Sequence, residues 1–181
     1  MQNEGCDTVV MEASSQGFKL DRTYGIMFDI GVFTNISPDH IGENEHKDFD
    51  EYLGCKKMLF SQCKTGIFNA DDPETDRISS GCTCKKLTFG YKSDADFRAA
   101  SPYFGSRDGK LVTEYDITLN GNTHRLVIPL LGEISVYNSL CAASVAAVLG
   151  CTYDQIEKGL CKTVVRGRNE SVDVGKDFSV I

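Results

Sequence analysis

Short apolar runs that end in polar side chains recur along the chain, and they predict an open α/β sheet. Residues 7–11 (DTVVM), 29–35 (DIGVFTN) and 66–72 (GIFNADD) each have the pattern of a buried strand followed directly by polar positions. Residues 85–91 (KKLTFGY) are again strand-like. Since parallel strands end at one shared edge of a sheet, we expect the polar residues to build a site there.

The helices are predicted from capping residues and helical spacing. Asp48 is the expected N-cap of a helix that runs to about Lys64 and stops at Gly66, with Asp50 and Glu51 in its first turn. Three further helices are predicted, one starting at Pro73 and two at 133–150 and 152–160.

Between residues 96 and 131 the pattern changes to hairpins. YDITL and HRLVIPL flank NGNT, and an Asn-Gly pair is a strong hairpin signal. Residues 171–181 indicate two more strands, the last one cut off at Ile181. The fold class is therefore α/β, with a mostly parallel, Rossmann-like sheet, flanking helices and a small antiparallel region.

Composition narrows the function classes. The chain has 181 residues, of which 41% are apolar, enough for one core or for part of a larger domain. The net charge is −7 and the basic residues are scattered, so we expect no nucleic-acid partner. No run approaches the roughly 20 apolar residues of a membrane span, and the first residues lack a signal-peptide pattern. We expect a cytoplasmic protein.

The sequence gives little support for a zinc site or for a glycine-rich phosphate-binding loop. Most of the eight cysteines lie in apolar patterns, where cysteine behaves as a small hydrophobe, and Cys82 and Cys84 have no second pair at zinc spacing. Neither G-x-x-x-x-G-K-[ST] nor G-x-G-x-x-G is present, so these residues include no phosphate-cradling loop.

Six segments in order, VVMEASSQG, DIGVFTNISPDHI, EYLGCKKMLF, IFNADD, LLGEISVYNSLCAA and VVRGRNESV, resemble the central ATP-binding domain of the Mur ligases, most closely the MurE type. The resemblance covers nearly the whole chain. The family's domain opens with a P-loop strand before this region and is followed by a separate C-terminal domain. The resemblance thus implies that residues 1–181 are a partial central domain that lacks both.

The resemblance also implies a reaction. Mur ligases use ATP to activate a carboxylate of a UDP-N-acetylmuramoyl peptide as an acyl phosphate, which the amine of an amino acid then attacks, in peptidoglycan biosynthesis. Mg²⁺ neutralises the phosphates and prefers oxygen ligands, so carboxylates are expected at strand ends. In the family, carbon dioxide carbamylates a lysine that supports the metal.

By resemblance, the first polar strand end holds metal and substrate. Glu12 corresponds to a magnesium-binding glutamate, although a solvated strand-end glutamate is the alternative. Ser14 and Arg22 are candidates for contacting the UDP-muramoyl substrate, and a plain surface arginine is the alternative for Arg22. The family more often has histidine at the position of Gln16, which leaves that histidine's contribution open.

The resemblance places the modified lysine on the helix after Asp48. Tyr52 and Lys56 match the family's Tyr-x-x-x-Lys pattern, and the four-residue spacing puts both on one helix face. Lys56 is therefore the expected carbamylated residue, with Lys57 facing solvent. His40 matches a histidine near the second metal, and a loop histidine that only caps a carbonyl is the alternative. Asp39 fits turn chemistry equally well.

The nucleotide contacts are also inferred from resemblance. Asn138 matches an asparagine near the adenine, while Ser135 replaces a second one with a shorter hydrogen-bonding group. Arg168 matches an arginine that approaches ATP. We interpret Asn69 and Asp71 as structural residues of a strand-to-helix turn, with Asn69 possible near the nucleotide.

Other readings stay open. One alternative is a different ligase of the superfamily that acts on another substrate, such as folylpolyglutamate synthetase, cyanophycin synthetase or MurT. Another is a truncated chain that binds nucleotide or substrate weakly without catalysis. We expect the isolated 181-residue chain to be inactive. The residues do not choose between lysine, meso-diaminopimelate and another amino acid.

Overall fold

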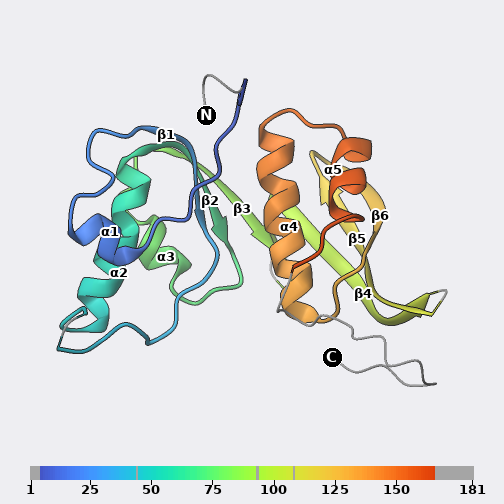
Figure 1. Ribbon diagram of the computed structural model, residues 1–181, viewed down its shortest axis with the longest axis horizontal. Helices are drawn as coiled ribbons and strands as arrows, with labels where there is room; N and C mark the ends of the chain where they lie inside the picture. Colours follow the sequence, from blue (N-terminus) through green and yellow to red (C-terminus); the bar gives the residue numbers. More distant parts are fainter. Residues whose placement is uncertain (1–4, 44, 93, 108, 166–181) are drawn as a thin grey trace.

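Six strands form one sheet in the computed structural model, which describes residues 5–43, 45–92, 94–107 and 109–165. The strands lie side by side in the order in which they occur along the chain (Figure 1). They are β1 (Phe28–Phe33), β2 (Cys63–Asn69), β3 (Lys85–Gly90), β4 (Phe97–Arg107), β5 (Lys110–Leu119) and β6 (Asn122–Ile128).

The helices fall into two groups. Figure 1 shows α1, α2 and α3 gathered at one end of the molecule and α4 and α5 at the other. Their bounds are α1 (Ser15–Lys19), α2 (Phe49–Lys57), which continues as the 3₁₀ helix η2 (Met58–Ser61), α3 (Thr75–Ser79), α4 (Glu133–Val148) and α5 (Tyr153–Leu160). Within the described residues, no helix combines the length and apolar character needed to cross a bilayer.

The sheet changes direction at β4. The pairs β1–β2, β2–β3 and β3–β4 are parallel, whereas β4–β5 and β5–β6 are antiparallel. Asn120 and Gly121 join β5 to β6 with φ angles of 50° and 81°, the left-handed geometry of a tight hairpin. The predicted parallel sheet with an antiparallel region at one side is confirmed.

Strand β2 separates two hydrophobic cores. Successive side chains on a strand point to opposite faces, and here Ile67 and Phe68 are both fully buried. Ile67 packs in the core that α4 and α5 cover, while Phe68 packs in the core beneath α2 and η2. The sheet therefore has helices on both faces at β2, which leaves its strand ends as the place for polar groups.

The predicted strand at 7–11 is wrong. These residues are irregular, and Val10 is 93% exposed. An apolar run forms a strand only where a neighbouring strand supplies hydrogen-bond partners, and among the described residues the only strand paired with β1 is β2. Glu12 therefore follows an exposed irregular segment and not a buried strand.

The helix after Asp48 starts as predicted but ends early. The Asp48 carboxylate accepts a hydrogen bond from the backbone N of Glu51 at 2.8 Å. Regular helix ends at Lys57, and Lys64 and Gly66 belong to β2. Pairing with β1 and β3 on both sides outweighs the local helical pattern there. The strands expected at 171–181 lie outside the described residues.

Candidate functional site

The loops after β1 and β2 are tied together by the side chains of the NADD segment. Asn69 Nδ2 donates to the carbonyl of Thr34 at 2.8 Å, and Asp72 Oδ2 accepts from the backbone N of Ile36 at 3.1 Å. These bonds satisfy loop groups that a strand ladder no longer pairs. They fix the carboxyl ends of two neighbouring parallel strands against each other.

Asp71 connects the same edge to β3 and α4. Its Oδ2 accepts from the backbone N of Tyr91 at 2.6 Å, from that of Lys92 at 2.8 Å and from the hydroxyl of Tyr137 at 2.9 Å. Burial, and then the hydrogen bond to the Asp71 carboxylate, raise the pKa of Tyr137 above its usual value. These contacts confirm the structural role predicted for Asn69 and Asp71.

The expected nucleotide residues lie on or beyond α4. Asn138 follows Tyr137 and is exposed. Ser135, one turn earlier, donates its hydroxyl to the carbonyl of Leu131 at 3.0 Å, so its hydrogen is already used inside the helix. Arg168 lies outside the described residues.

The substrate candidates surround α1. Ser14 Oγ accepts from the backbone N of Gly17 at 3.0 Å and caps the helix, and within the described part of the chain no acceptor is recorded for its hydroxyl hydrogen. Arg22 is exposed, and its backbone N donates to the carbonyl of Gly17 at 2.9 Å. Glu12, two residues before Ser14, is also exposed. All three side chains are thus accessible near one short helix.

His40 and Lys56 meet at one aromatic ring. Lys56 Nζ lies 5.2 Å from the centroid of the Tyr52 ring, and the His40 ring centroid lies 5.8 Å from it. Tyr52 itself is 5% exposed. The four-residue spacing therefore does place Lys56 over Tyr52, with the His40 loop alongside.

Exposure does not separate the two adjacent lysines. Lys57 was expected to face solvent, but it is half-buried like Lys56. It lines a different hollow, of about 260 Å³, together with Gly54, Met58 and Cys82. Direction distinguishes the pair, because the structure records only Lys56 over the Tyr52 ring.

An ion pair joins α1 to α2. Lys19 Nζ lies 2.9 Å from Glu51 Oε2, which also accepts from the backbone N of Lys47 at 2.9 Å. The hydrogen bond from Lys19 is the largest cause that lowers the pKa of Glu51 to about 2, followed by the one from Lys47. Glu51 is therefore ionised at neutral pH.

His46, which no sequence pattern indicated, is 0% exposed and lies between α1 and α2. Its Nε2 is 2.9 Å from Ser15 Oγ, and its Nδ1 is 3.5 Å from Glu51 Oε2. No local pattern marks it, because it stands among polar residues in a loop. The one indication in the sequence was that His46 lies between the His40 motif and the helix that follows Asp48.

The described side chains do not form a complete metal centre. Among them, no group of three or more His, Cys, Asp or Glu residues is arranged to hold an ion. His40 and Lys56 lie against the same Tyr52 ring, and a lysine ammonium has no lone pair to offer a metal ion. An ion at this place would need oxygen ligands from phosphates or from a modified lysine.

The prediction that most cysteines are packed as small hydrophobic residues is confirmed only for some of them. Cys63, Cys82 and Cys84 pack in the core that contains Phe68, and burial raises the pKa of Cys63 to about 12. Cys6, Cys151 and Cys161 are exposed instead. A buried thiol with a raised pKa is a poor nucleophile and metal ligand at neutral pH.

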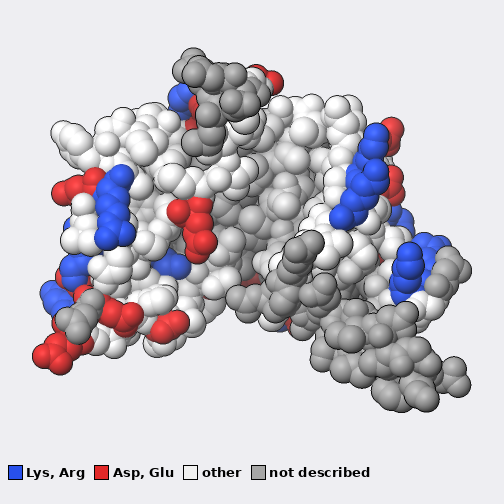
Figure 2. All heavy atoms as spheres, in the orientation of Figure 1, with Lys and Arg blue, Asp and Glu red and all other residues white. Residues whose placement is uncertain are grey.

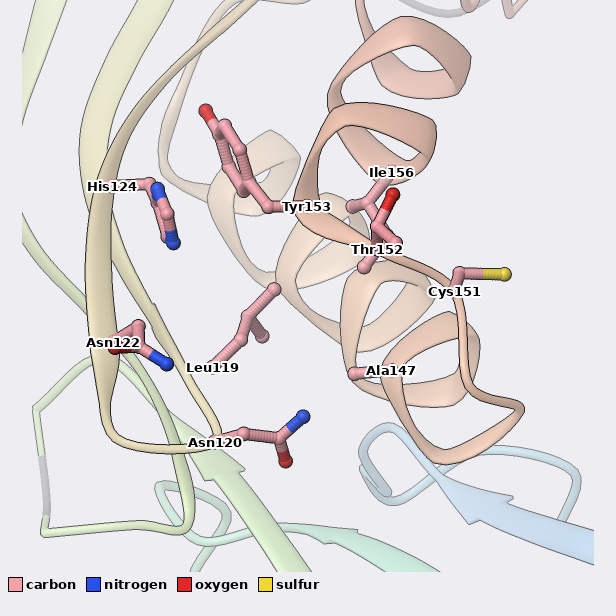
Figure 3. Close-up of a pocket in the computed structure, with 9 residues that line it drawn as sticks. All are labelled: Leu119, Asn120, Asn122, His124, Ala147, Cys151, Thr152, Tyr153 and Ile156. Atoms are coloured by element: carbon pink, nitrogen blue, oxygen red, sulfur yellow. The ribbon is translucent and has the colours of Figure 1, made fainter.

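A cavity of about 160 Å³ lies away from the expected residues, between the β5–β6 hairpin and the α4–α5 connection. Figure 3 shows His124 and Tyr153 lining it, with Asn120 and Asn122 further along. The centroids of the stacked His124 and Tyr153 rings are 4.0 Å apart. None of the residues proposed from the sequence lines this cavity.

On the face shown in Figure 2, basic and acidic side chains are interspersed, which is typical of a solvated surface.

A family model described as the Mur ligase middle domain matches residues 1–146. The chain belongs to the Mur ligase family. The UDP-N-acetylmuramoyl-L-alanyl-D-glutamate--2,6-diaminopimelate ligase of Bacillus licheniformis is 35% identical over 191 residues, which cover 100% of this chain and 38% of that protein. The chain thus spans well under half the length of this Mur ligase relative.

Solved structures of Mur ligases share the fold. A UDP-N-acetylmuramoyl-L-alanyl-D-glutamate--2,6-diaminopimelate ligase superposes with a TM-score of 0.81 at 24% identity, covering 94% of this chain and 35% of that one. MurF ligase of Thermotoga maritima, in complex with ADP, superposes with a TM-score of 0.69 at 17% identity, covering 89% and 36%. The mostly parallel sheet with flanking helices is therefore that of the Mur ligase family.

Proposed function

We propose that this chain is the middle part of a longer ATP-dependent ligase that joins an amino acid to a UDP-N-acetylmuramoyl peptide in peptidoglycan biosynthesis. Family membership supports the ligase class, and the named relative supports this substrate. The observation that carries the proposal is the meeting of His40 and Lys56 at the Tyr52 ring, beside α1. The missing length, relative to that ligase, is where we expect the P-loop strand and a C-terminal domain.

Each group of residues has a proposed task. Ser14 and Arg22 would bind the UDP-muramoyl peptide, because a hydroxyl hydrogen and a guanidinium fork suit phosphate and carboxylate oxygens. Asn138 and Arg168 would contact ATP. The ADP bound by a fold neighbour supports a nucleotide in this fold.

Magnesium fits this scheme only with help from the nucleotide. We propose Glu12, His40 and Lys56 as protein groups around it, with phosphate oxygens completing the shell. Carbon dioxide would add to the neutral amine of Lys56 and release one proton, giving a carbamate oxygen ligand. When bound, the ion would supply positive charge that neutralises the phosphates.

The amino acid to test first is 2,6-diaminopimelate. The Bacillus licheniformis relative carries that substrate in its name. Lysine is the matched alternative, since it lacks only the second carboxylate. Comparing the two as acceptors tests specificity separately from the ligase reaction itself.

The test uses the full-length protein that contains this chain. ADP release should require the UDP-muramoyl dipeptide and the amino acid together, and Lys56→Ala should lower kcat at least about 100-fold, the upper range for removing support of a metal site. Lys57→Ala is the adjacent control and should stay within about threefold of the wild type. ADP release that is independent of any muramoyl peptide would overturn the proposal.

A further inference from the structure

His46 is a fully buried imidazole to which the proposed reaction assigns no role. Its side chain is 0% exposed, while the His40 side chain is 53% exposed. A buried polar ring is costly unless its nitrogens have partners, so its neighbours indicate why it is there.

The two ring nitrogens of His46 have different neighbours. Nε2 lies 2.9 Å from Ser15 Oγ, and a hydroxyl can either donate to or accept from an imidazole nitrogen. Nδ1 lies 3.5 Å from Glu51 Oε2, too far for a good hydrogen bond but close enough for attraction.

The order serine, histidine, glutamate is also that of a hydrolytic triad, but burial argues against hydrolysis. Ser15 is 6% exposed and His46 is 0% exposed. A nucleophile must reach a substrate carbonyl, and this hydroxyl faces the protein interior. The three residues therefore act within the fold.

His46 touches the three segments that hold the proposed metal and substrate residues. Ser15 directly follows Ser14 at the start of α1. The backbone N of His46 donates to the carbonyl of His40 at 3.0 Å, and its ring lies 5.2 Å from that of Tyr52 on α2. Lys19 also joins these segments, through the Glu45 carbonyl at 3.1 Å and Glu51 Oε2 at 2.9 Å, but its side chain is 34% exposed, whereas that of His46 is 0% exposed.

We infer that His46 is a positioning residue, which holds the start of α1 and the His40 loop against the Tyr52–Lys56 face of α2 through Ser15, the His40 backbone and the Tyr52 ring. This inference rests on the proposed function for its kinetic consequence. Its structural consequence, the anchoring of α1, can be measured without any activity.

The first experiment uses kinetics of the full-length protein. His46→Leu keeps an apolar filling but removes both polar contacts, and KM for the UDP-muramoyl peptide should rise about 10- to 100-fold, as expected for loss of a group that orients ligand-binding residues. KM for ATP should change less than about threefold. His46→Gln, which can still reach Ser15, should recover part of the loss.

The matched control is His124→Leu. Like His46, His124 lies against a tyrosine ring, but it lies on β6 beside the separate cavity shown in Figure 3. Its replacement should leave both KM values within about twofold. Ser15→Ala combined with His46→Leu should be no worse than His46→Leu alone, because the two residues act through one contact.

The second experiment measures amide hydrogen exchange over residues 14–22. The backbone N groups of Phe18 and Leu20, which close α1, should exchange about tenfold faster in His46→Leu and at the wild-type rate in His124→Leu. If His46→Leu does not fold, His46→Gln and Ser15→Ala give the same comparison. Unchanged exchange, or faster exchange with an unchanged peptide KM, would overturn the inference; a wild type without ligase activity would refute only the proposed function.

Discussion

Polar side chains at the end of β2 bond to other segments of the chain, whereas those on the solvent-facing side of β5 and β6 pair with neighbouring strands of the antiparallel sheet. Asn69 and Asp71 reach the loop after β1, the end of β3 and helix α4. By contrast, Thr118 bonds to Thr123 directly opposite it, at 2.8 Å, in an exposed cross-strand pair.

The difference shows where this fold can accept a functional residue. At the parallel strand ends, the groups that shape the proposed site also hold segments together, so a substitution there changes stability and geometry at once. On the antiparallel hairpin, one face is buried and the polar side chains of the other face pair with neighbouring strands, as Arg125 does with Asp116 at 3.1 Å. Substitutions on that polar face should be nearly silent.

The largest expected effect comes from the core under the parallel strands. Phe68→Ala should lower the free energy of unfolding by about 3–5 kcal/mol, because it removes a fully buried ring that packs against Phe60. Leu126→Ala, in the core of the antiparallel strands, should cost about 2–5 kcal/mol. Urea denaturation of both variants measures this, and separate transitions would show that the two halves are not one cooperative unit.

A smaller difference in unfolding free energy is expected between polar substitutions in the parallel part of the sheet and in the antiparallel part. Asp71→Ala should cost about 1.5–3 kcal/mol, because three donors lose a carboxylate partner. Thr118→Val, which removes only an exposed pair, should stay within about 1 kcal/mol. Equal losses in urea denaturation would break the comparison. Asp71→Asn should also lower the raised pKa of Tyr137, which absorbance titration can follow.

The next effect is confined to helix α5. Thr152 and Gln155 form a reciprocal capping box, and Thr152→Ala should cost about 1 kcal/mol. Hydrogen exchange should rise in α5 but not in α2. Thr123→Ala is the exposed control, and an equal loss in both variants would argue against a capping contribution.

The smallest effect at neutral pH is expected for the α1–α2 ion pair, and it should depend on acid. The pKa of Glu51 is lowered from 4.5 to about 2, so its stabilising contribution is complete above about pH 4.5 and is lost as the pH falls through about 2. Glu51→Gln should flatten that acid limb of the stability curve. A wild-type curve with the same acid slope as the variant would contradict this.

Local signals predicted much of the fold. The Asp48 cap, the Asn120–Gly121 hairpin and the helix end at Gly150 depend on neighbouring residues, and all three are confirmed. Residues 7–11 and the end of α2 depend on which strands pair in space, and no window of sequence contains that information. The two errors therefore share one physical cause.

The same reasoning applies to the candidate site. Tyr52 and Lys56 are four residues apart on one helix, so their proximity follows from helical geometry. The His46–Ser15 contact joins residues 31 positions apart, and it could not be predicted from spacing. The roles of Glu12, Ser14, Arg22, Asn138 and Arg168 stay predictions for the experiments above.

Gly66, in the middle of β2, limits which substitutions this part of the sheet can accept. A Cβ at this position would lie 2.6 Å from a ring carbon of Phe68 and 3.0 Å from one of Phe60. Gly66→Ala therefore needs a smaller partner at one of these two positions. In a library that varies all three positions and is selected for folding, we expect alanine at 66 only together with a smaller residue at 60 or 68. Substitutions at this strand should therefore occur in coupled pairs.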